Sequence, residues 1–163
     1  MSDIREQSAQ ELLQVYGDVL AELREKGIVR TGNNPIGDFA ETLFIRTFGW
    51  VSESNSAKGH DAIDDTGARY QIKTRRITNK NRSRELGVLR NLDDVPFDYL
   101  AAVLLGERFE ITRAIILPIS AVNERSAFRA HINGWKFHLN DSVWTHPDAR
   151  DVTEQLQATA RSL

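Results

Sequence analysis

Apolar positions recur at helical spacing in two segments near the start of the chain. In the segment from Asp3 to Lys26 they fall three and four positions apart, and Gly27 follows. The segment from Pro35 to Phe48 has the same spacing, comes directly after Asn34, a helix-capping residue type, and is followed by Gly49. The pattern predicts two helices, over about 3–26 and 35–48, joined by a loop.

After residue 50 the pattern changes to one typical of strands. Residues 60–65 and 68–77 flank an Asp-Thr-Gly turn and predict a hairpin in which Gly67 adopts a positive φ. The stretch that follows, 78–91, is polar, basic and poor in apolar residues. It is typical of a long loop or a mobile element.

The second half of the chain predicts two buried strands and several short elements. Residues 97–105 and 111–119 are almost continuously apolar, which indicates interior strands of a sheet covered on both faces. A short helix beginning near 118–120, a short strand at 135–139 and a terminal helix near 148–161 complete the predicted order. This order predicts an α/β protein with helices packed on a central sheet, in a single domain over 1–163.

Composition excludes several classes of chemistry. The chain has 163 residues and no cysteine, which rules out disulfides, thiolate catalysis and cysteine-type zinc sites. His131, His138 and His146 lack cysteine partners and tight spacing, so we do not expect them to bind zinc. No apolar run is long enough to span a membrane and the start lacks the apolar core of a signal peptide. We therefore expect a cytoplasmic protein with no membrane partner.

The formal net charge of −2 conceals an uneven distribution. Between Arg69 and Arg90 eight basic residues stand against a single acid, Glu85, so this segment is +7 and the rest of the chain is −9. Such asymmetry indicates an anionic partner, although a solvated loop is an equal alternative on charge alone.

The predicted hairpin brings together residue types suited to phosphodiester hydrolysis. With the turn centred on Thr66, Asp61 lies opposite Gln71, and Lys73 shares their face. Hard cations such as Mg²⁺ favour oxygen ligands, and a nearby lysine can orient a metal-bound water or stabilise developing negative charge. A slip of one residue in register would separate these groups.

At these residues the sequence resembles a known family. Gly59-His60-Asp61, followed ten residues later by Gln71-Ile72-Lys73, resembles the signature of the PD-(D/E)xK nuclease superfamily. Residues 37–41, which end in Glu41, resemble the G-x-x-x-E pattern of its Holliday-junction-resolvase and Mrr-like members. The resemblance covers about 35–120 and implies a restriction-endonuclease-like three-layer fold, a central mixed β-sheet flanked by helices. The helix over 3–26 and residues 121–163 would be additions to that core.

The resemblance also implies a site. Asp61 and Glu41 would hold Mg²⁺ or Mn²⁺ with the backbone carbonyl of Ile72 and, weakly, Gln71, while Lys73 would position the attacking water. His60 stands where the signature has proline, and Gln71 replaces the usual acid. The second change removes a negative charge and weakens cation binding, because the affinity of hard cations follows ligand charge.

The basic segment begins on the same strand as this site. We expect its arginine and lysine side chains to contact DNA phosphates without reading sequence. The expected contacts are Arg75, Arg76, Lys80, Arg82 and Arg84. The sequence leaves open RNA as the substrate and a homodimer as the active form.

Three functions remain open. The leading one is a metal-dependent nuclease that hydrolyses DNA phosphodiester bonds with little sequence specificity. The second is a catalytically weak or inactive nuclease-fold subunit that binds nucleic acid in a defence or repair system. The third is an interaction module, in which Asp61 only pairs with Arg75 or Arg76 and Glu41 is an ordinary helix carboxylate. Asp38 is a rival to Glu41 in the site, although a role in stabilising the helix N-terminus suits it better.

Overall fold

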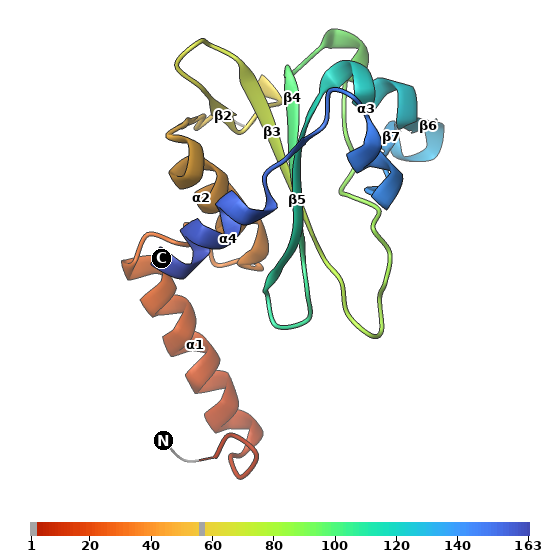
Figure 1. Cartoon of the computed structure of the whole chain (residues 1–163). Helices are drawn as coiled ribbons and strands as arrows, with labels where there is room; N and C mark the ends of the chain where they lie inside the picture. The colour runs from red at the N-terminus through yellow and green to blue at the C-terminus, as the bar shows by residue number, and fades with distance from the viewer. Residues whose placement is uncertain (1–2, 56–57) are drawn as a thin grey trace.

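The computed structural model of the chain describes residues 3–55 and 58–163 and shows an α/β protein with a six-strand mixed sheet and four helices (Figure 1). The helices are α1 (Ala9–Glu25), α2 (Ile36–Phe48), α3 (Ile119–Arg125) and α4 (Thr153–Ser162). The strands of the large sheet are β1 (Val51–Ser52), β2 (Ala62–Ile63), β3 (Arg69–Arg76), β4 (Tyr99–Leu105), β5 (Ile111–Pro118) and β8 (Arg150–Asp151). A separate pair consists of β6 (Ala127–Arg129) and β7 (Gly134–Lys136).

The large sheet has the strand order β1-β2-β3-β4-β5-β8. Only β3 and β4 run parallel, and the other neighbours are antiparallel. The two strands expected to be interior, β4 and β5, lie inside the sheet, and six of the seven residues of β4 are buried. This part of the prediction is confirmed.

Both faces of the sheet are covered (Figure 1). On one face α2 and α4 pack on the sheet, and Phe44 and Leu156 contribute fully buried side chains. On the other face the core includes α3, the chain around β7 and the crossover between β3 and β4, with Leu86, Leu89 and Phe137 buried. Two apolar layers thus hold β3 and β4 rigidly between them.

The predicted hairpin has the predicted register. Ala62 pairs with Tyr70, the backbone N–H of Asp61 donates to the Tyr70 carbonyl at 2.8 Å, and Gly67 has a φ of 86°. The paired part of β2 is only two residues long, shorter than the strand expected over 60–65.

The crossover from β3 to β4, residues 77–98, contains no α-helix, as its polar composition predicts, and has one 3₁₀ turn at Leu92–Asp94. It is nevertheless anchored to the body. The Leu86 N–H donates to the Phe137 carbonyl at 3.0 Å, and Leu89 exchanges two backbone hydrogen bonds with Trp135. Isolated leucines therefore fix a segment whose overall polarity resembles that of a free loop.

The N-terminal helix extends away from the body (Figure 1). It begins at Ala9 rather than near residue 3, because Ser8 and Glu11 form a capping box there. None of its residues is buried, although its apolar side chains have the spacing of an amphipathic helix. Leu23, at its C-terminal end, is half-buried. Among the described residues no helix is long and apolar enough to cross a membrane.

Three short strands, β1, β6 and β8, were not predicted from the sequence, and β8 displaces part of a predicted helix. β8 occupies residues 150–151, inside the helix expected from about 148, and pairs with β5 through Ile115 and Ile116. α4 consequently begins at Thr153. β1 extends the other edge of the sheet beyond β2. Strands of two residues contain no repeat from which periodicity can be recognised.

Candidate functional site

The candidate site lies where β2 ends and β3 continues. On β3, β2 pairs with Arg69 and Tyr70 alone, and within the described chain the rest of β3 has β4 as its single strand partner. The side chain of Asp61 occupies the start of this gap, where its Oδ2 accepts the Ile72 N–H at 2.7 Å. Since the N–H and carbonyl of one strand residue point to the same edge, the Ile72 carbonyl faces the gap as well.

Asp61 and Gln71 meet as the register predicts. The Gln71 amide Nε2 donates to Asp61 Oδ2 at 2.6 Å, so this oxygen accepts two hydrogen bonds. Burial raises the pKa of Asp61 above its ordinary value, and the hydrogen bonds and the positive charge of Lys73 offset only part of that rise. The carboxylate is therefore held in one orientation, and its burial deprives the charged form of hydration.

Glu41 reaches the site from α2. Ala40, Leu43 and Phe44 bury one side of this helix against the sheet, and Glu41 stands at the border of that apolar stripe. Burial and the nearby charge of Asp61 raise the pKa of Glu41, while Arg30 acts in the opposite direction. Asp61, 20 positions further along the sequence, thus lies close enough to act on the charge of Glu41.

Lys73 approaches from the other layer. Side chains alternate along β3, so Gln71 and Lys73 face away from the core residues Tyr70 and Ile72. The Lys73 ammonium lies against Gly87 of the crossover, about 3.8 Å from where a β-carbon there would be. Burial lowers the pKa of Lys73, Arg90 lowers it further, and Asp61 opposes both. The amine is thus closer to neutrality than a surface lysine.

Arg30 belongs to the site and was not found from the sequence. Its Nη2 forms an ion pair with Glu41, and its Nη1 donates to Ser52 Oγ at 3.3 Å. The residue lies in the loop before α2, where no periodicity or motif distinguishes it. Asp38, considered from the sequence as a rival to Glu41, instead accepts the backbone N–H groups of Arg30 and Thr31.

The carboxylates suit a small hard cation better than a large one. No group of three His, Asp or Glu residues that could hold a metal occurs in residues 3–55 and 58–163. Asp61 and Glu41 each keep one oxygen, Oδ1 and Oε1, without a hydrogen bond or ion pair to the described residues. Mg²⁺ is commonly held by one or two carboxylates together with waters and substrate phosphates, so this donor set fits it. The amide group of Gln71 that faces Asp61 is a donor, which makes Gln71 a positioning residue for that carboxylate.

The five basic residues expected to bind nucleic acid have different surroundings. Arg75 donates to the Ser83 carbonyl at 3.0 Å, Arg76 lies over the Phe109 ring at 4.2 Å, and Arg84 pairs with Asp141 at 2.6 Å. Lys80 and Arg82 are exposed, and neither has a side-chain hydrogen bond or ion pair with the described residues. Of these five side chains, the two at the tip of the crossover, Lys80 and Arg82, are therefore the ones that make no contact of this kind within the described chain.

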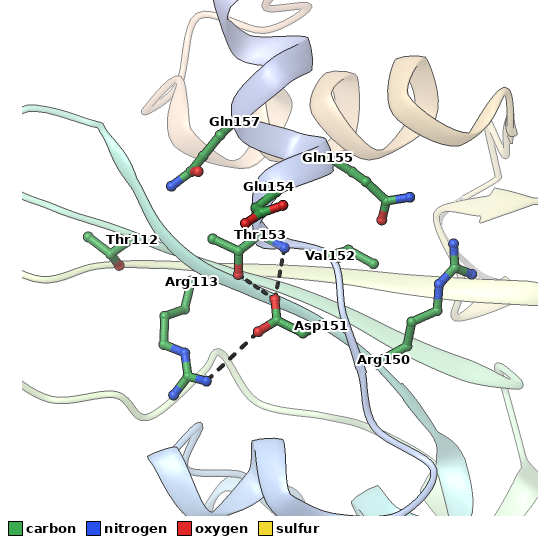
Figure 2. Close-up of a pocket in the computed structure, with 9 residues that line it drawn as sticks. All are labelled: Thr112, Arg113, Arg150, Asp151, Val152, Thr153, Glu154, Gln155 and Gln157. Carbon is green, nitrogen blue, oxygen red and sulfur yellow. Dashed lines mark hydrogen bonds and ion pairs between the residues drawn. The ribbon is translucent and has the colours of Figure 1, made fainter.

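A polar hollow beside the start of α4 is separate from this site. It lies at the β8 edge of the sheet, opposite the β1–β2 edge that carries Asp61 (Figure 2). Within it, Asp151 accepts from Thr153 Oγ1 at 2.6 Å and is 4.0 Å from Arg113. These contacts stabilise the end of the sheet where α4 begins.

Comparison with known proteins does not assign this chain to a family. No family model matches it, and no curated protein does. The class that the fold defines is an α/β protein with a mixed six-strand sheet.

Proposed function

We propose that the protein is a metal-dependent nuclease that hydrolyses DNA phosphodiester bonds, on a restriction-endonuclease-like fold. The observation that carries the proposal is the convergence of Glu41, Asp61 and Lys73 at the open edge of β3. Two carboxylates whose pKa values are raised, chiefly by burial, and a lysine whose pKa is lowered form an unusual group, and such groups are concentrated at functional sites.

Each residue has a role in this chemistry. A divalent cation held by Asp61, Glu41 and the Ile72 carbonyl would lower the pKa of a bound water and offset charge on the phosphate. Gln71 keeps Asp61 oriented through its 2.6 Å hydrogen bond. Lys73, held in the opposite layer, is suited to orient the attacking water or to stabilise the charge that develops on the phosphate oxygens.

The order of elements supports the fold assignment in part. A helix carrying Glu41 precedes three antiparallel strands, and the fourth strand, β4, runs parallel to the third. The nuclease core has an α-helix between its third and fourth strands. Here the crossover 77–98 has a 3₁₀ turn in that place and covers Lys73 with extended chain.

The charge distribution supports DNA as the substrate. The open edge of β3 leads from Lys73 to Arg75 and on to the exposed Lys80 and Arg82. Arg90 lies close enough to Lys73 to lower its pKa. A phosphate backbone along this edge would meet positive charge on either side of the carboxylates without any sequence-reading element.

The test is cleavage of supercoiled plasmid with Mg²⁺ or Mn²⁺ by the wild type, Asp61→Asn and Lys73→Met. Lys26→Met is the matched control, because Lys26, the residue that follows α1, is exposed and its ammonium pairs with Glu22 at 3.3 Å. We expect cutting by the wild type and the control and a loss of at least about a hundredfold in the two site variants. Equal cutting by all four proteins would indicate a contaminant and contradict the proposal.

A second candidate is a nuclease-fold module that binds nucleic acid without cutting it. Gln71 favours this second candidate, because its neutral side chain gives the site one carboxylate fewer than the nuclease signature has and so weakens metal binding. Salt-dependent DNA binding by the wild type, with no cutting and no detectable heat of Mn²⁺ binding, would select this candidate over the enzyme.

A further inference from the structure

The backbone of Arg30 is fixed by hydrogen bonds that do not involve its side chain. Its N–H and that of Thr31 donate to Asp38 Oδ2 at 2.7 and 2.9 Å. The two preceding residues, Ile28 and Val29, are buried, and Thr42 of α2 donates to the Ile28 carbonyl at 3.0 Å. The loop is thus fixed to the first turns of α2, and the Arg30 side chain begins beside the site whatever its own contacts are.

The side chain is only partly committed to the protein. It is 52% exposed although it pairs with Glu41, whose side chain is 23% exposed. Its two terminal nitrogens contact Glu41 and Ser52, Nη2 also lies 3.9 Å from Asp38 Oδ1, and the described residues offer no partner to Nε. A guanidinium presents five donors in a fork that matches phosphate oxygens, so several of them face solvent at the mouth of the site.

Arg30 and a metal ion would compete for the same carboxylate. In the metal-free site the guanidinium neutralises Glu41, which burial and Asp61 otherwise disfavour as an anion. A divalent cation at Glu41 and Asp61 would supply that neutralisation and repel the guanidinium at short range. The side chain would then be free to turn to an anion while its backbone stays fixed.

We propose that Arg30 is an exchange residue, which neutralises Glu41 when the site is empty and moves to a phosphate oxygen of the nucleic-acid backbone once a cation takes its place. This inference rests on the proposed function and adds to it a link between metal loading and substrate binding. It assigns to Arg30 a positioning role in the empty site and a binding role in the loaded one.

Calorimetric titration with Mn²⁺ alone tests the first half. We expect Arg30→Met to bind Mn²⁺ about two- to fivefold more tightly than the wild type, because its competitor is gone. Arg30→Lys, which keeps the charge, should stay close to the wild type. Arg46→Met is the control. Arg46 lies on α2, the helix that carries Glu41, and donates to the Lys26 carbonyl at 3.4 Å, so its substitution should leave the Mn²⁺ affinity unchanged.

Binding of a short DNA duplex, with and without Mn²⁺, tests the second half, with Lys73→Met as the background that prevents cutting and leaves the proposed metal ligands Asp61 and Glu41 in place. Arg30→Met should lower DNA affinity several-fold, and the loss should be larger in the presence of Mn²⁺. Unchanged or weaker Mn²⁺ binding by folded Arg30→Met would overturn the exchange even if the wild type cuts DNA. Failure of the wild type to bind Mn²⁺ would instead overturn the proposed nuclease, so the two failures are distinct.

Discussion

At the scale of single residues the site is a balance between buried charges of opposite sign. Asp61 and Glu41 have raised pKa values, Lys73 has a lowered one, and all three shifts have burial as their largest cause. Hydrogen bonds and ion pairs compensate only in part. Such an arrangement reduces stability and is retained where the groups perform chemistry.

Gln71→Glu should make the stability of the protein depend on metal. The new carboxylate would stand where the Gln71 amide now donates to Asp61 at 2.6 Å, so a hydrogen bond becomes a repulsion between like charges. Without metal we expect a loss of about 1–3 kcal/mol, which is several degrees in melting temperature. Mg²⁺ should restore most of it and stabilise the variant more than the wild type.

The control for that experiment is Gln71→Leu, which removes the hydrogen bond without adding charge. It should lower the melting temperature to a similar extent with or without Mg²⁺. A Gln71→Glu variant whose melting temperature does not respond to Mg²⁺ or Mn²⁺ would show that no cation binds between these residues.

Glu41→Gln should stabilise the protein at neutral pH. Because the pKa of Glu41 is raised in the folded state, the folded protein binds this proton at a higher pH than the unfolded chain. The ionised form therefore costs stability above the folded pKa, and that cost disappears as pH falls through the folded pKa toward 4.5. The variant should melt a few degrees higher than the wild type at pH 7, and the difference should shrink toward pH 4.5.

Asp38→Asn, on the same helix as Glu41, should have the opposite effect on stability. Burial raises the pKa of Asp38, but the hydrogen bonds from Arg30 and Thr31 outweigh burial and leave the pKa lowered. Its ionised form therefore adds stability above pH 3.8, which is lost as pH falls through the lower folded pKa. The variant should melt below the wild type at pH 7. Melting curves between pH 3 and 8 compare each variant with the wild type. If both variants melted above the wild type at pH 7, or both below it, the opposite pKa shifts of Glu41 and Asp38 would be contradicted.

At the scale of elements, periodicity predicts the long helices and strands. It does not predict short strands that depend on tertiary contacts. The stripe of α2, the runs of β4 and β5 and the turn at Gly67 each contain enough residues to define a repeat or a conformation. β1 and β8 are two residues long and are defined only by their pairing with a neighbouring strand, β2 and β5 respectively. The apolar spacing of α1 predicts a helix correctly, but spacing alone does not say whether another element covers it.

The same distinction applies to the candidate site. Asp61, Gln71 and Lys73 were predicted together because a hairpin register relates them through one turn. Glu41 came from a resemblance, and in the structure the charge of Asp61 contributes to raising its pKa. Arg30 was missed because its position depends on how the loop before α2 folds back on that helix, a contact that no local pattern encodes.

The two glycines that flank β2 should respond differently to alanine. Both have positive φ, 77° at Gly59 and 86° at Gly67, but an added β-carbon at Gly59 would lie 2.8 Å from Pro96 Cβ, whereas nothing lies near Gly67. Gly67→Ala should cost about 1–2 kcal/mol from backbone strain alone. Gly59→Ala adds a steric clash and should cost at least about twice as much.

Because Gly59 lies two residues before Asp61, its substitution should also weaken Mn²⁺ binding, and that of Gly67 should not. Urea unfolding and Mn²⁺ titration measure the two effects separately. Equal losses of stability in the two variants would show that the contact with Pro96 does not constrain this end of the strand.

At the scale of the whole molecule, the net charge of −2 is a poor guide to binding. The acidic excess lies outside residues 69–90, while the segment itself has +7. In the structure part of this positive charge is neutralised, since Arg69 pairs with Asp98 and Arg84 pairs with Asp141. Arg75, Arg76 and Arg90 donate to neutral carbonyls, which leaves their charge in place. Positive charge therefore extends along the crossover, and at its tip Lys80 and Arg82 are exposed without a side-chain contact to the described residues.

Lys80 and Arg82 should therefore contribute to DNA affinity, and Arg84 should contribute mainly to structure. The double variant Lys80→Gln/Arg82→Gln should reduce the dependence of log K on log salt by up to about 1.8, the value for two lost phosphate contacts, without changing the melting temperature. Arg84→Gln should leave that slope unchanged and cost up to about 1 kcal/mol, because Asp141 loses a partner at 2.6 Å and keeps Arg113. Fluorescence anisotropy of a labelled duplex over a salt series, with a melting curve for each variant, measures both quantities. If the double variant keeps the wild-type slope, the crossover tip is a solvated loop and DNA runs elsewhere on the surface.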